Sequence, residues 1–457
     1  MPGKLSHSDW EWTWSIFPVS CFLSALTCAT YFLAFPPTSP IYRKLSMCLI
    51  AVPVWYAFRY SDYVSYDYMV NDTFARTCLI WISHASYEIC ILEFKPALSC
   101  QVMNKGAEVK ERIWQALKVL NDRNHAQMAQ QTDYSLPLGD RSLPLGDHSL
   151  PLVSNFVDGE EKYVTTDKKN DELVGAPIRL LRGVPMTHGH GHGYTRWKFV
   201  GYHILKWFAL QLFQVAYIHF ETHWSPLARL GDPRNAPLSG MTMTFYQFYC
   251  DFEDTFDWCI GSVILYDSWH SLFAIFFVGT GLDESQEWSL ALFGNISNAW
   301  SVRTYWSKHW HNFIYYSFNG HIKCVTRGWF GMKRGIISTR LVENTTVFFM
   351  SGLMHTAVRW QGFPEGDIWA ITWFYTGQMI PIIIESIVAH QYRKLRRYVA
   401  SKTQLKEDAR WLSRMEYAVG YLWVFSWFMY CVSMYYDVRN KWTEAKFASR
   451  GWNLPPQ

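Results

Sequence analysis

Two histidine-bearing segments hold the residue types best suited to chemistry. One runs from Trp300 to His311 and reads Trp-Ser-Val-Arg-Thr-Tyr-Trp-Ser-Lys-His-Trp-His. The other is a lone histidine, His355, inside the apolar run from Thr346 to Val358. An imidazole in an apolar segment of membrane-spanning length is costly to bury, which makes it a candidate functional group. Two such segments in one chain favour a reaction carried out within a membrane.

His355 has Ser351 and Arg359 one helical turn to either side. An imidazole that titrates near neutral pH can take a proton from a hydroxyl group and later return it. In acyl transfer it would act as general base toward an alcohol that attacks a thioester, because the hydroxyl alone is a weak nucleophile. A histidine that packs by hydrogen bonding to a neighbouring helix would give the same pattern.

The run that ends at His311 is predicted to be helical. On a continuous helix, spacings of three and four place one set of side chains on a single face: Trp300, Arg303 or Thr304, Ser307 and His311. Trp306 and Trp310 form an aromatic stripe beside it. His311 near Lys308 and Arg303 could orient an acceptor or hold a donor that carries phosphate. An interfacial aromatic belt with snorkelling cations explains the same residues without chemistry.

Three further polar groups stand out against apolar surroundings. Asp267 and His270 are three residues apart, so they either satisfy each other's charge or line a substrate cavity. Gln378 and Glu385 are seven residues apart on one predicted helix face, where they could close a reaction chamber. Histidine alternates with glycine over residues 187–193, which predicts a glycine-rich lead-in to a span rather than a metal site.

The composition is that of an integral membrane protein. Of 457 residues, 49% are hydrophobic and 18% aromatic. Only 18% are charged, against about 25% in a typical soluble domain. Basic residues flank the apolar runs instead of forming a patch, so no nucleic-acid partner is predicted. The ten cysteines include no Cys-x-x-Cys pair, which disfavours a disulfide framework or a zinc site.

Apolar runs of spanning length predict an all-α, polytopic protein with about eight transmembrane helices. They lie near residues 14–35, 45–60, 77–94, 197–219, 257–281, 342–360, 366–390 and 416–436. The segment from Trp288 to Phe330 is too polar to span and predicts re-entrant or interfacial helices. The basic loop 391–414 predicts a cytoplasmic side, which the segments 282–341 and 95–196 would share.

This pattern of spans predicts four regions. They are N-terminal transmembrane helices over 1–94, a partly disordered cytoplasmic loop over 95–196, a catalytic transmembrane core over 197–436 and a tail over 437–457. The loop contains a repeated Ser-Leu-Pro-Leu-Gly-Asp sequence that starts at Ser135 and again at Ser142. Its regularly spaced prolines prevent a continuous helix, and no chemistry is predicted there.

The two histidine segments also resemble a known family. The run Tyr305-Trp306-x-x-x-Trp310-His311 resembles the Phe-Trp-x-x-x-Trp-His signature of wax-synthase-like membrane-bound O-acyltransferases (MBOAT). The run Ser351-Gly352-x-x-His355, about one span downstream, resembles that family's Ser-Gly-x-x-His. Phe374-x-x-x-Gln378 and Glu385 resemble its C-terminal half, and the resemblance covers about residues 195–436.

The sequence departs from the family pattern at a few positions. Lys308 and His309 stand where the family often has two arginines, and Tyr305 replaces a phenylalanine. The family's upstream proline is absent at Phe293-Gly294-Asn295. Both histidines of the pattern are kept.

The resemblance implies an MBOAT-like fold with an internal reaction chamber and an O-acyltransferase activity. The donor would be an acyl-CoA, expected to be acetyl-CoA, and the acceptor a lipophilic, hydroxylated compound of the terpenoid class. His355 would be the catalytic base, and His311 would position the acceptor or stabilise developing charge. The residues expected to bind substrate are Trp306, Trp310, Arg303, Lys308, Ser351, Asp267, His270 and Gln378. No metal or bound cofactor is implied, membrane lipids are the other partner, and a multi-pass location in the endoplasmic reticulum is expected.

Two other functions stay open from the sequence. An intramembrane terpenoid cyclase or isomerase could use His355 as acid and base without any CoA. A polytopic transporter could use the same histidines in a proton relay, although no duplicated halves or paired broken helices are visible in the sequence. Dependence on acyl-CoA separates the acyltransferase from both.

Overall fold

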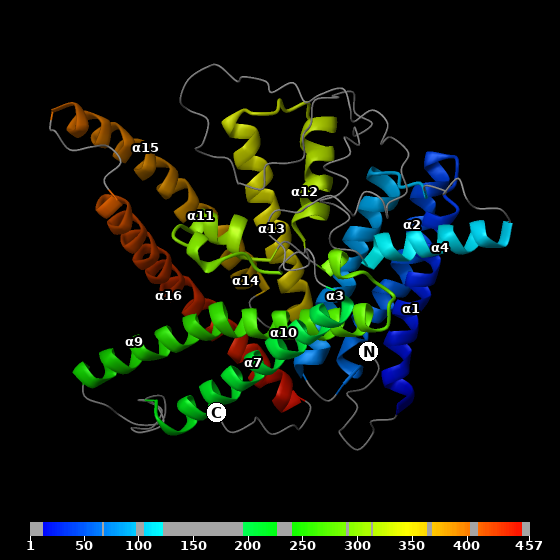
Figure 1. The fold of residues 1–457 in the computed structure, drawn as a ribbon, viewed down its shortest axis with the longest axis horizontal. Helices are drawn as coiled ribbons and strands as arrows, with labels where there is room; N and C mark the ends of the chain where they lie inside the picture. Colours follow the sequence, from blue (N-terminus) through cyan, green and yellow to red (C-terminus); the bar gives the residue numbers. More distant parts are fainter. Residues whose placement is uncertain are drawn as a thin grey trace. The chain divides into compact units, whose positions relative to one another are not determined.

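A computed structural model describes residues 12–65, 68–96, 105–121, 195–225, 240–288, 292–311, 314–362, 368–402 and 410–449. Over these residues the regular structure is entirely helical, as predicted (Figure 1). The repeat over residues 135–152 and the histidine–glycine run over 187–193 lie outside the described residues.

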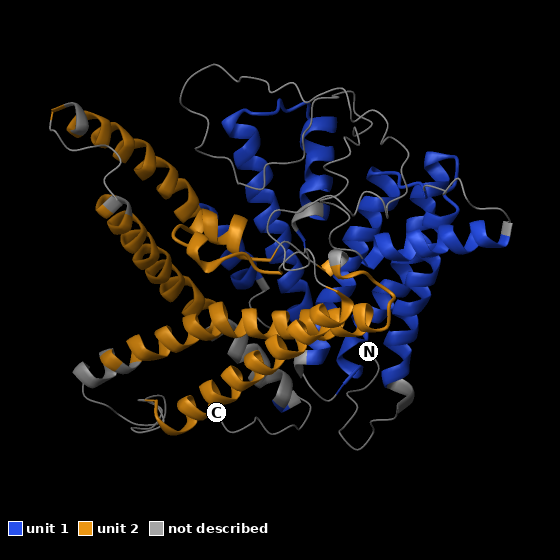
Figure 2. Ribbon diagram, viewed as in Figure 1, with its two compact units in different colours: residues 1–183, 312–379, 438–457 blue, residues 184–311, 380–437 orange. Residues whose placement is uncertain are grey.

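The chain forms two compact units (Figure 2). The first comprises residues 1–183, 312–379 and 438–457, and the second comprises residues 184–311 and 380–437. His355 therefore belongs to the first unit and His311 to the second. The division into four regions that was read from the spans stays a prediction.

The N-terminal part of the first unit is a group of four packed helices. They are α1 (Trp12–Ala34), α2 (Pro40–Arg59), α3 (Tyr68–Ser86) and α4 (Lys105–Asn121). Short turns extend α2 and α3, namely η2 (Ser61–Tyr63) and the π turn η3 (Tyr87–Ile91). Helix α1 packs against α2 and α4, and α2 packs against α3.

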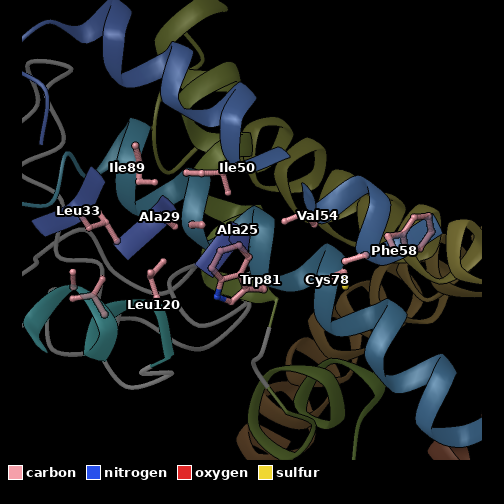
Figure 3. Packing of buried hydrophobic residues seen from close by; sticks show 14 of the residues in the cluster. Ala25, Ala29, Leu33, Ile50, Val54, Phe58, Cys78, Trp81, Ile89 and Leu120 are labelled. Carbon is pink, nitrogen blue, oxygen red and sulfur yellow. The ribbon is translucent and has the colours of Figure 1, made fainter. Parts of the chain in front are cut away.

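Small side chains let these helices approach closely (Figure 3). Ala25 and Ala29 are one turn apart on α1 and are fully buried with Ile50 of α2 and Leu120 of α4. Small residues at a helix interface favour such contact because the backbones come near one another. Helix α4 lies within the segment 95–196 that is predicted as a cytoplasmic loop, and this part of the segment packs against α1.

The C-terminal part of the first unit carries His355. Its helices are α12 (Tyr315–Lys323), the π turn η10 (Cys324–Trp329), α13 (Ile337–Gly362) and α14 (Ile368–Gly377). Helix α13 packs against α12, α14 and α3. The neighbours of α13 therefore determine the surroundings of its histidine.

The second unit combines long helices with a series of short turns. Its long helices are α7 (Arg196–His223), α9 (Gly240–Phe256), α10 (Ser262–Gly279), α15 (Met379–Lys402) and α16 (Arg410–Ser449); Met379 of α15 and residues 438–449 of α16 are assigned to the first unit. The π turn η6 (Asp257–Gly261) joins α9 to α10. The short elements are η7 (Ser285–Trp288), η8 (Ile296–Asn298), α11 (Val302–Thr304) and η9 (Tyr305–His309).

Four helical stretches among the described residues are long and apolar enough to cross a membrane. They are Ser15–Ala34, Gln247–Gly279, Trp369–Val399 and Arg414–Tyr436. The other predicted spans overlap α2, α3, α7 and α13, which have 20, 19, 28 and 26 residues, although the span predicted at 77–94 begins within α3 and continues through η3. That these four helices cross a membrane stays a prediction.

Two details of the predicted span at residues 366–390 differ in the structure. A turn at Gln378 separates α14 from α15, so this stretch is two helices that follow each other directly. Helix α15 then continues to Lys402, and much of the predicted basic loop 391–414 is helical. The long side chains there favour a helix that extends beyond the apolar segment.

Candidate active site

Gly352 brings helices α13 and α14 of the first unit into backbone contact. A Cβ atom at this position would lie 2.8 Å from both the Cα atom and the carbonyl oxygen of Thr372. The hydroxyl groups of Thr356 and Thr372 share a hydrogen bond of 2.7 Å, and both residues are buried. The Ser-Gly-x-x-His pattern therefore fixes α14 against the helix that carries His355.

The imidazole of His355 stacks on the phenol ring of Tyr375. The ring centroids are 4.4 Å apart and the ring planes differ by 4°. Tyr375 of α14 is buried, whereas His355 is half-buried. A parallel ring contact restricts rotation of the imidazole.

The residues one turn from His355 have different surroundings. Arg359 is buried, and its guanidinium Nη2 lies 3.5 Å from Oδ1 of Asp72 on α3. Asp72 also pairs with Arg76 on its own helix. Arg359 thus ties α13 to α3. Ser351 is buried within α13, and its contact with substrate stays a prediction.

Gln378 is fully buried at the turn between α14 and α15. Its side-chain Nε2 donates a hydrogen bond of 3.1 Å to the carbonyl oxygen of Phe374, and its backbone N–H donates one of 3.2 Å to Tyr375. These bonds satisfy carbonyl groups at the end of α14 that lack partners within the helix. Its role in substrate binding stays a prediction.

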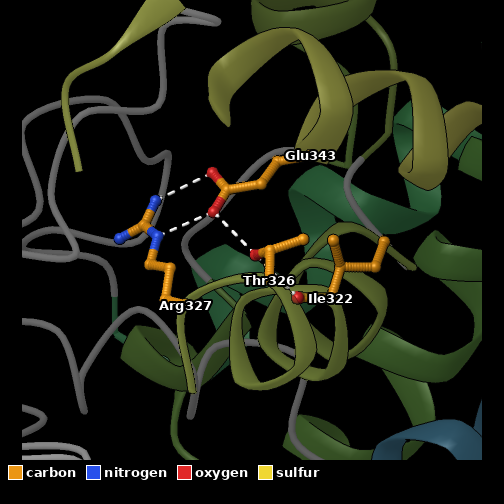
Figure 4. Close-up of polar contacts among 4 residues, drawn as sticks. All are labelled: Ile322, Thr326, Arg327 and Glu343. Atoms are coloured by element: carbon orange, nitrogen blue, oxygen red, sulfur yellow. Dashed lines mark hydrogen bonds and ion pairs between the residues drawn. The ribbon is translucent and has the colours of Figure 1, made fainter. Parts of the chain in front are cut away.

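An ion pair fixes the π turn η10 to α13 (Figure 4). Arg327 donates from Nε and Nη2 to the two carboxylate oxygens of Glu343, at 2.7 and 2.8 Å. The Thr326 hydroxyl donates to the same carboxylate at 3.1 Å. Burial, together with the nearby guanidinium of Arg327, lowers the pKa of Lys323 to about 8. Sequence spacing did not predict this cluster, because its members lie on separate elements.

In the second unit, the helix that precedes His311 ends earlier than predicted. It runs from Val302 through the π turn to His309, and the Trp310 N–H closes it with a 2.7 Å hydrogen bond to the Tyr305 carbonyl. Trp310 then adopts an extended backbone, with φ −69° and ψ 153°. The expectation of one continuous helical face that includes His311 is therefore wrong, since the wider turn ends the helix.

The aromatic residues of this segment pack against Trp258. The rings of Trp258 and Trp310 are parallel, with centroids 4.8 Å apart and planes within 6°. Trp306 meets both rings edge-on, at 5.9 and 5.6 Å. Trp258 lies in the π turn η6, whose extra residue per turn sets its direction. The predicted aromatic stripe is thus a packed cluster, and substrate contact by its members stays a prediction.

His311 lies between two aromatic rings at the end of this segment. Its ring meets Tyr266 of α10 at 5.4 Å and Phe293 at 5.7 Å, in both cases nearly edge-on at 75° and 76°. Trp310 and His311 therefore both contact the continuous helix formed by η6 and α10. Tyr266 was not singled out from the sequence, although it directly precedes Asp267.

His309 and Gly294 hold the segment from the other side. The Gly294 N–H donates to the His309 carbonyl at 2.8 Å, and His309 Nδ1 is 2.9 Å from the Gly294 carbonyl oxygen. A Cβ atom at Gly294 would lie 1.7 Å from the Lys308 carbonyl oxygen. Glycine at position 294, where the family's proline is absent, is therefore required by the close contact with the Lys308 backbone. Burial lowers the pKa of His309, and the bond to Gly294 opposes this effect.

The two cations of the segment differ in their surroundings. Arg303 is half-buried and donates through Nη2 to the Ser386 hydroxyl of α15. Lys308 is exposed. Contact of either residue with donor or acceptor stays a prediction.

Asp267 pairs with a lysine that the sequence analysis did not single out. Its carboxylate lies 2.7 Å from Lys206 Nζ of α7, whereas His270 Nδ1 lies 3.9 Å from the other oxygen. The buried ring of His270 meets the rings of His203 and Trp288 at 5.8 and 5.3 Å. Polar residues at helical spacing along the apolar helix α7 were the feature of the sequence that could have indicated these contacts. Substrate contact by Asp267 and His270 stays a prediction.

Comparison with curated proteins finds fungal acetyltransferases. Acetyltransferase aurG of Calcarisporium arbuscula is 29% identical over 174 residues, which are 36% of this chain and 38% of that protein. Acetyltransferase atnC of an Arthrinium species is 27% identical over 199 residues, 43% of this chain and 42% of its own. Acetyltransferase TRI7 of Fusarium sporotrichioides is 26% identical over 175 residues, 38% of each chain. The matched segment spans about two fifths of each relative. No solved structure matches the chain.

A family model matches the part of the chain that contains His311 and His355. Residues 288–376 match the model of the Membrane bound O-acyl transferase family. This range includes both His311 and His355, together with Gly352 and the stacked Tyr375. The resemblance recognised from the two histidine patterns is therefore confirmed, because the segment that carries both patterns matches the model of the membrane-bound O-acyl transferase family.

Proposed function

We propose that this protein is a membrane O-acyltransferase that moves an acyl group from acyl-CoA to a hydroxyl group of a lipophilic acceptor. The observation that supports this most is His355, held by a ring stack within the segment that matches the family. The similar fungal proteins are acetyltransferases, which favours acetyl-CoA as donor. A terpenoid alcohol is the acceptor class that we propose, by analogy with fungal members of this family.

In the proposed reaction, His355 acts as general base. The ring nitrogen that carries no proton in the neutral imidazole accepts the proton of the acceptor hydroxyl, and the oxygen attacks the thioester carbonyl carbon. The tetrahedral intermediate then collapses, the carbon–sulfur bond breaks, and the CoA sulfur takes the proton back from the imidazolium. The products are the ester and free CoA, with no net change in protons. Tyr375 keeps the imidazole in place during both proton transfers.

We assign to His311 the binding of the acceptor and the stabilisation of developing negative charge. Trp306 and Trp310 would present apolar surface to the acceptor, and Ser351 and Gln378 would line the reaction chamber. Arg303 and Lys308 would interact with the donor phosphates, since cations suit them. Asp267 and His270 would contribute polar contacts.

The proposed setting is a multi-pass protein of the endoplasmic reticulum with about eight spans. Acyl-CoA would reach the internal chamber from the cytoplasm, and the acceptor would enter from the lipid. Four long apolar helical stretches in the described part of the chain and the family match support a membrane location. The basic residues near the ends of α15 and α16 support the orientation.

The test is transfer of labelled acetyl groups from acetyl-CoA to a panel of lipophilic alcohols by membranes that contain the protein. We expect wild type to form labelled ester and His355→Ala to form none at equal protein level. The control is His390→Ala, because His390 is an exposed histidine of α15. Ester formation by His355→Ala at the wild-type rate would remove His355 as the base. Absence of product from all donors and acceptors with wild type would contradict the proposed activity.

A further inference from the structure

The carboxylate of Glu385, on α15, is a shared acceptor for three donors. Its Oε1 accepts hydrogen bonds from the Val302 N–H at 2.6 Å and from the Trp423 indole N–H at 2.9 Å. Its Oε2 accepts one from the Arg303 N–H at 3.2 Å. Val302 and Arg303 are the first two residues of α11, so the carboxylate caps the helix that leads to His311.

With this carboxylate, every N–H of the first helical turn has an acceptor. The Thr304 N–H donates to the Ser301 hydroxyl at 3.1 Å, and the Tyr305 N–H donates to the Ser301 carbonyl at 2.8 Å. A helix start otherwise leaves these groups without partners, which is costly away from water. A negative charge at a helix N-terminus is also favoured by the helix dipole.

Two further contacts hold the same end of the segment. The Arg303 guanidinium donates to Ser386, the residue that follows Glu385. A Cβ atom at Gly420 of α16 would lie 2.3 Å from the Trp300 carbonyl oxygen, so the chain before α11 lies directly against that helix. Both α15 and α16 therefore help to fix where the segment begins.

We propose that Glu385 is a positioning residue for His311. The helix from Val302 to His309 is short and closed at both ends, so a displacement of its first turn moves Trp310 and His311 with it. The three donors use both oxygens of Glu385, so its role is to hold the segment and not to react. This inference rests on the proposed function of His311 in acceptor binding.

The experiment compares Glu385→Ala and Glu385→Gln with a matched carboxylate on the same pair of helices. Glu416 of α16 accepts from Tyr392 and Arg396 of α15, at 2.8 and 2.9 Å, and belongs to a different contact. Glu416→Ala therefore loses an α15–α16 contact of the same kind and spares the cap on α11. Glu385→Gln keeps one acceptor oxygen and places an NH2 group opposite a backbone donor.

The first readout is amide hydrogen exchange over residues 301–311 in purified protein, which needs no substrate. We expect exchange there to be about tenfold faster or more in Glu385→Ala, intermediate in Glu385→Gln and unchanged in Glu416→Ala. Unchanged exchange in Glu385→Ala, or equal acceleration in Glu416→Ala, would overturn the positioning role.

The second readout is the kinetic effect on each substrate. We expect Glu385→Ala to raise KM for the acceptor about tenfold or more through displacement of His311, and to raise KM for acetyl-CoA as well, because Arg303 and Lys308 lie on the same segment. Glu385→Gln should recover part of both losses. An unchanged KM for the acceptor would contradict action through His311. Absence of transfer by wild type would contradict the proposed function, and the exchange result would still decide whether Glu385 holds the segment.

Discussion

Replacement of Gly352 by alanine should reduce both stability and catalysis. The new methyl carbon would lie 2.8 Å from backbone atoms of Thr372, which is roughly 0.7–1.2 Å closer than ordinary carbon contact. Backbone atoms cannot rotate away as a flexible side chain can, so α13 and α14 must separate. Overpacking of this kind costs about 1–3 kcal/mol.

The same separation would move Tyr375 away from the ring of His355. A displacement of about 1 Å at a catalytic group can lower the rate about 100-fold. We therefore expect Gly352→Ala to lower kcat for acetyl transfer by about 10- to 100-fold. The unfolding temperature in detergent should fall as well, because the helix contact is strained.

The assay measures initial rates and thermal unfolding for purified wild type, Gly352→Ala and a matched control. Gly377→Ala is that control, because a Cβ atom there has no neighbour within 4 Å and Gly377 also lies on α14 in a right-handed conformation. We expect Gly377→Ala to change stability by no more than about 1 kcal/mol. Wild-type rate and wild-type unfolding temperature in Gly352→Ala would refute the argument from backbone contact.

Three other predictions follow from the described contacts. Tyr375→Leu should lower kcat about tenfold, since loss of the stack frees the imidazole of His355, whereas Tyr375→Phe should stay near wild type in the same transfer assay. Gly294→Ala should lower the unfolding temperature and the acceptor kcat/KM, because the methyl group would collide with the Lys308 carbonyl; normal values for both would contradict this. The Lys323 pKa of about 8 lies below its ordinary value of 10.5, so the unfolded state binds more protons between these values and stability should rise with pH across that window. The difference in unfolding temperature between wild type and Lys323→Met should therefore be smaller at pH 10 than at pH 8. An equal difference at both pH values would refute the lowered pKa of Lys323.

The helical class and the two histidine segments could be predicted from the sequence because both depend on local patterns. Apolar runs of spanning length coincide with long helices such as α1 and α13. The pattern at Ser351, Gly352 and His355 lies within one helix, so spacing alone puts these residues near each other. Gly352 also has a use that its residue type suggests, namely close approach of a second backbone.

The end of the helix before His311 could not be predicted from spacing. A continuous 3.6-residue period places His311 on the same face as Arg303, but the π turn at Tyr305–His309 adds a residue and Trp310 is extended. Two hydrogen bonds to Gly294 also hold His309, the last residue of this turn. Gly294 lies 15 residues earlier in the chain and outside the helix, so no periodic pattern predicts these bonds.

Contacts between residues far apart in the sequence could not be predicted either. Asp267 and His270 were expected either to satisfy each other's charge or to line a substrate cavity, and the structure adds Lys206 of α7 as a closer partner of Asp267, at 2.7 Å against 3.9 Å for His270. Glu385 was singled out as a possible wall of the chamber, and the structure adds its role as the cap of α11. In both cases the residue type indicated a polar contact, but the partner was determined by the packing of separate helices.

The most direct test of the account is the stoichiometry between free CoA and ester in purified protein. With acetyl-CoA and a lipophilic alcohol present, wild type should release one CoA per ester formed, and omission of the alcohol should stop the release. His355→Ala should release neither product, while the His390→Ala control should behave as wild type. CoA release that does not depend on the alcohol, or ester formation that persists in His355→Ala, would contradict a transfer reaction with His355 as its base.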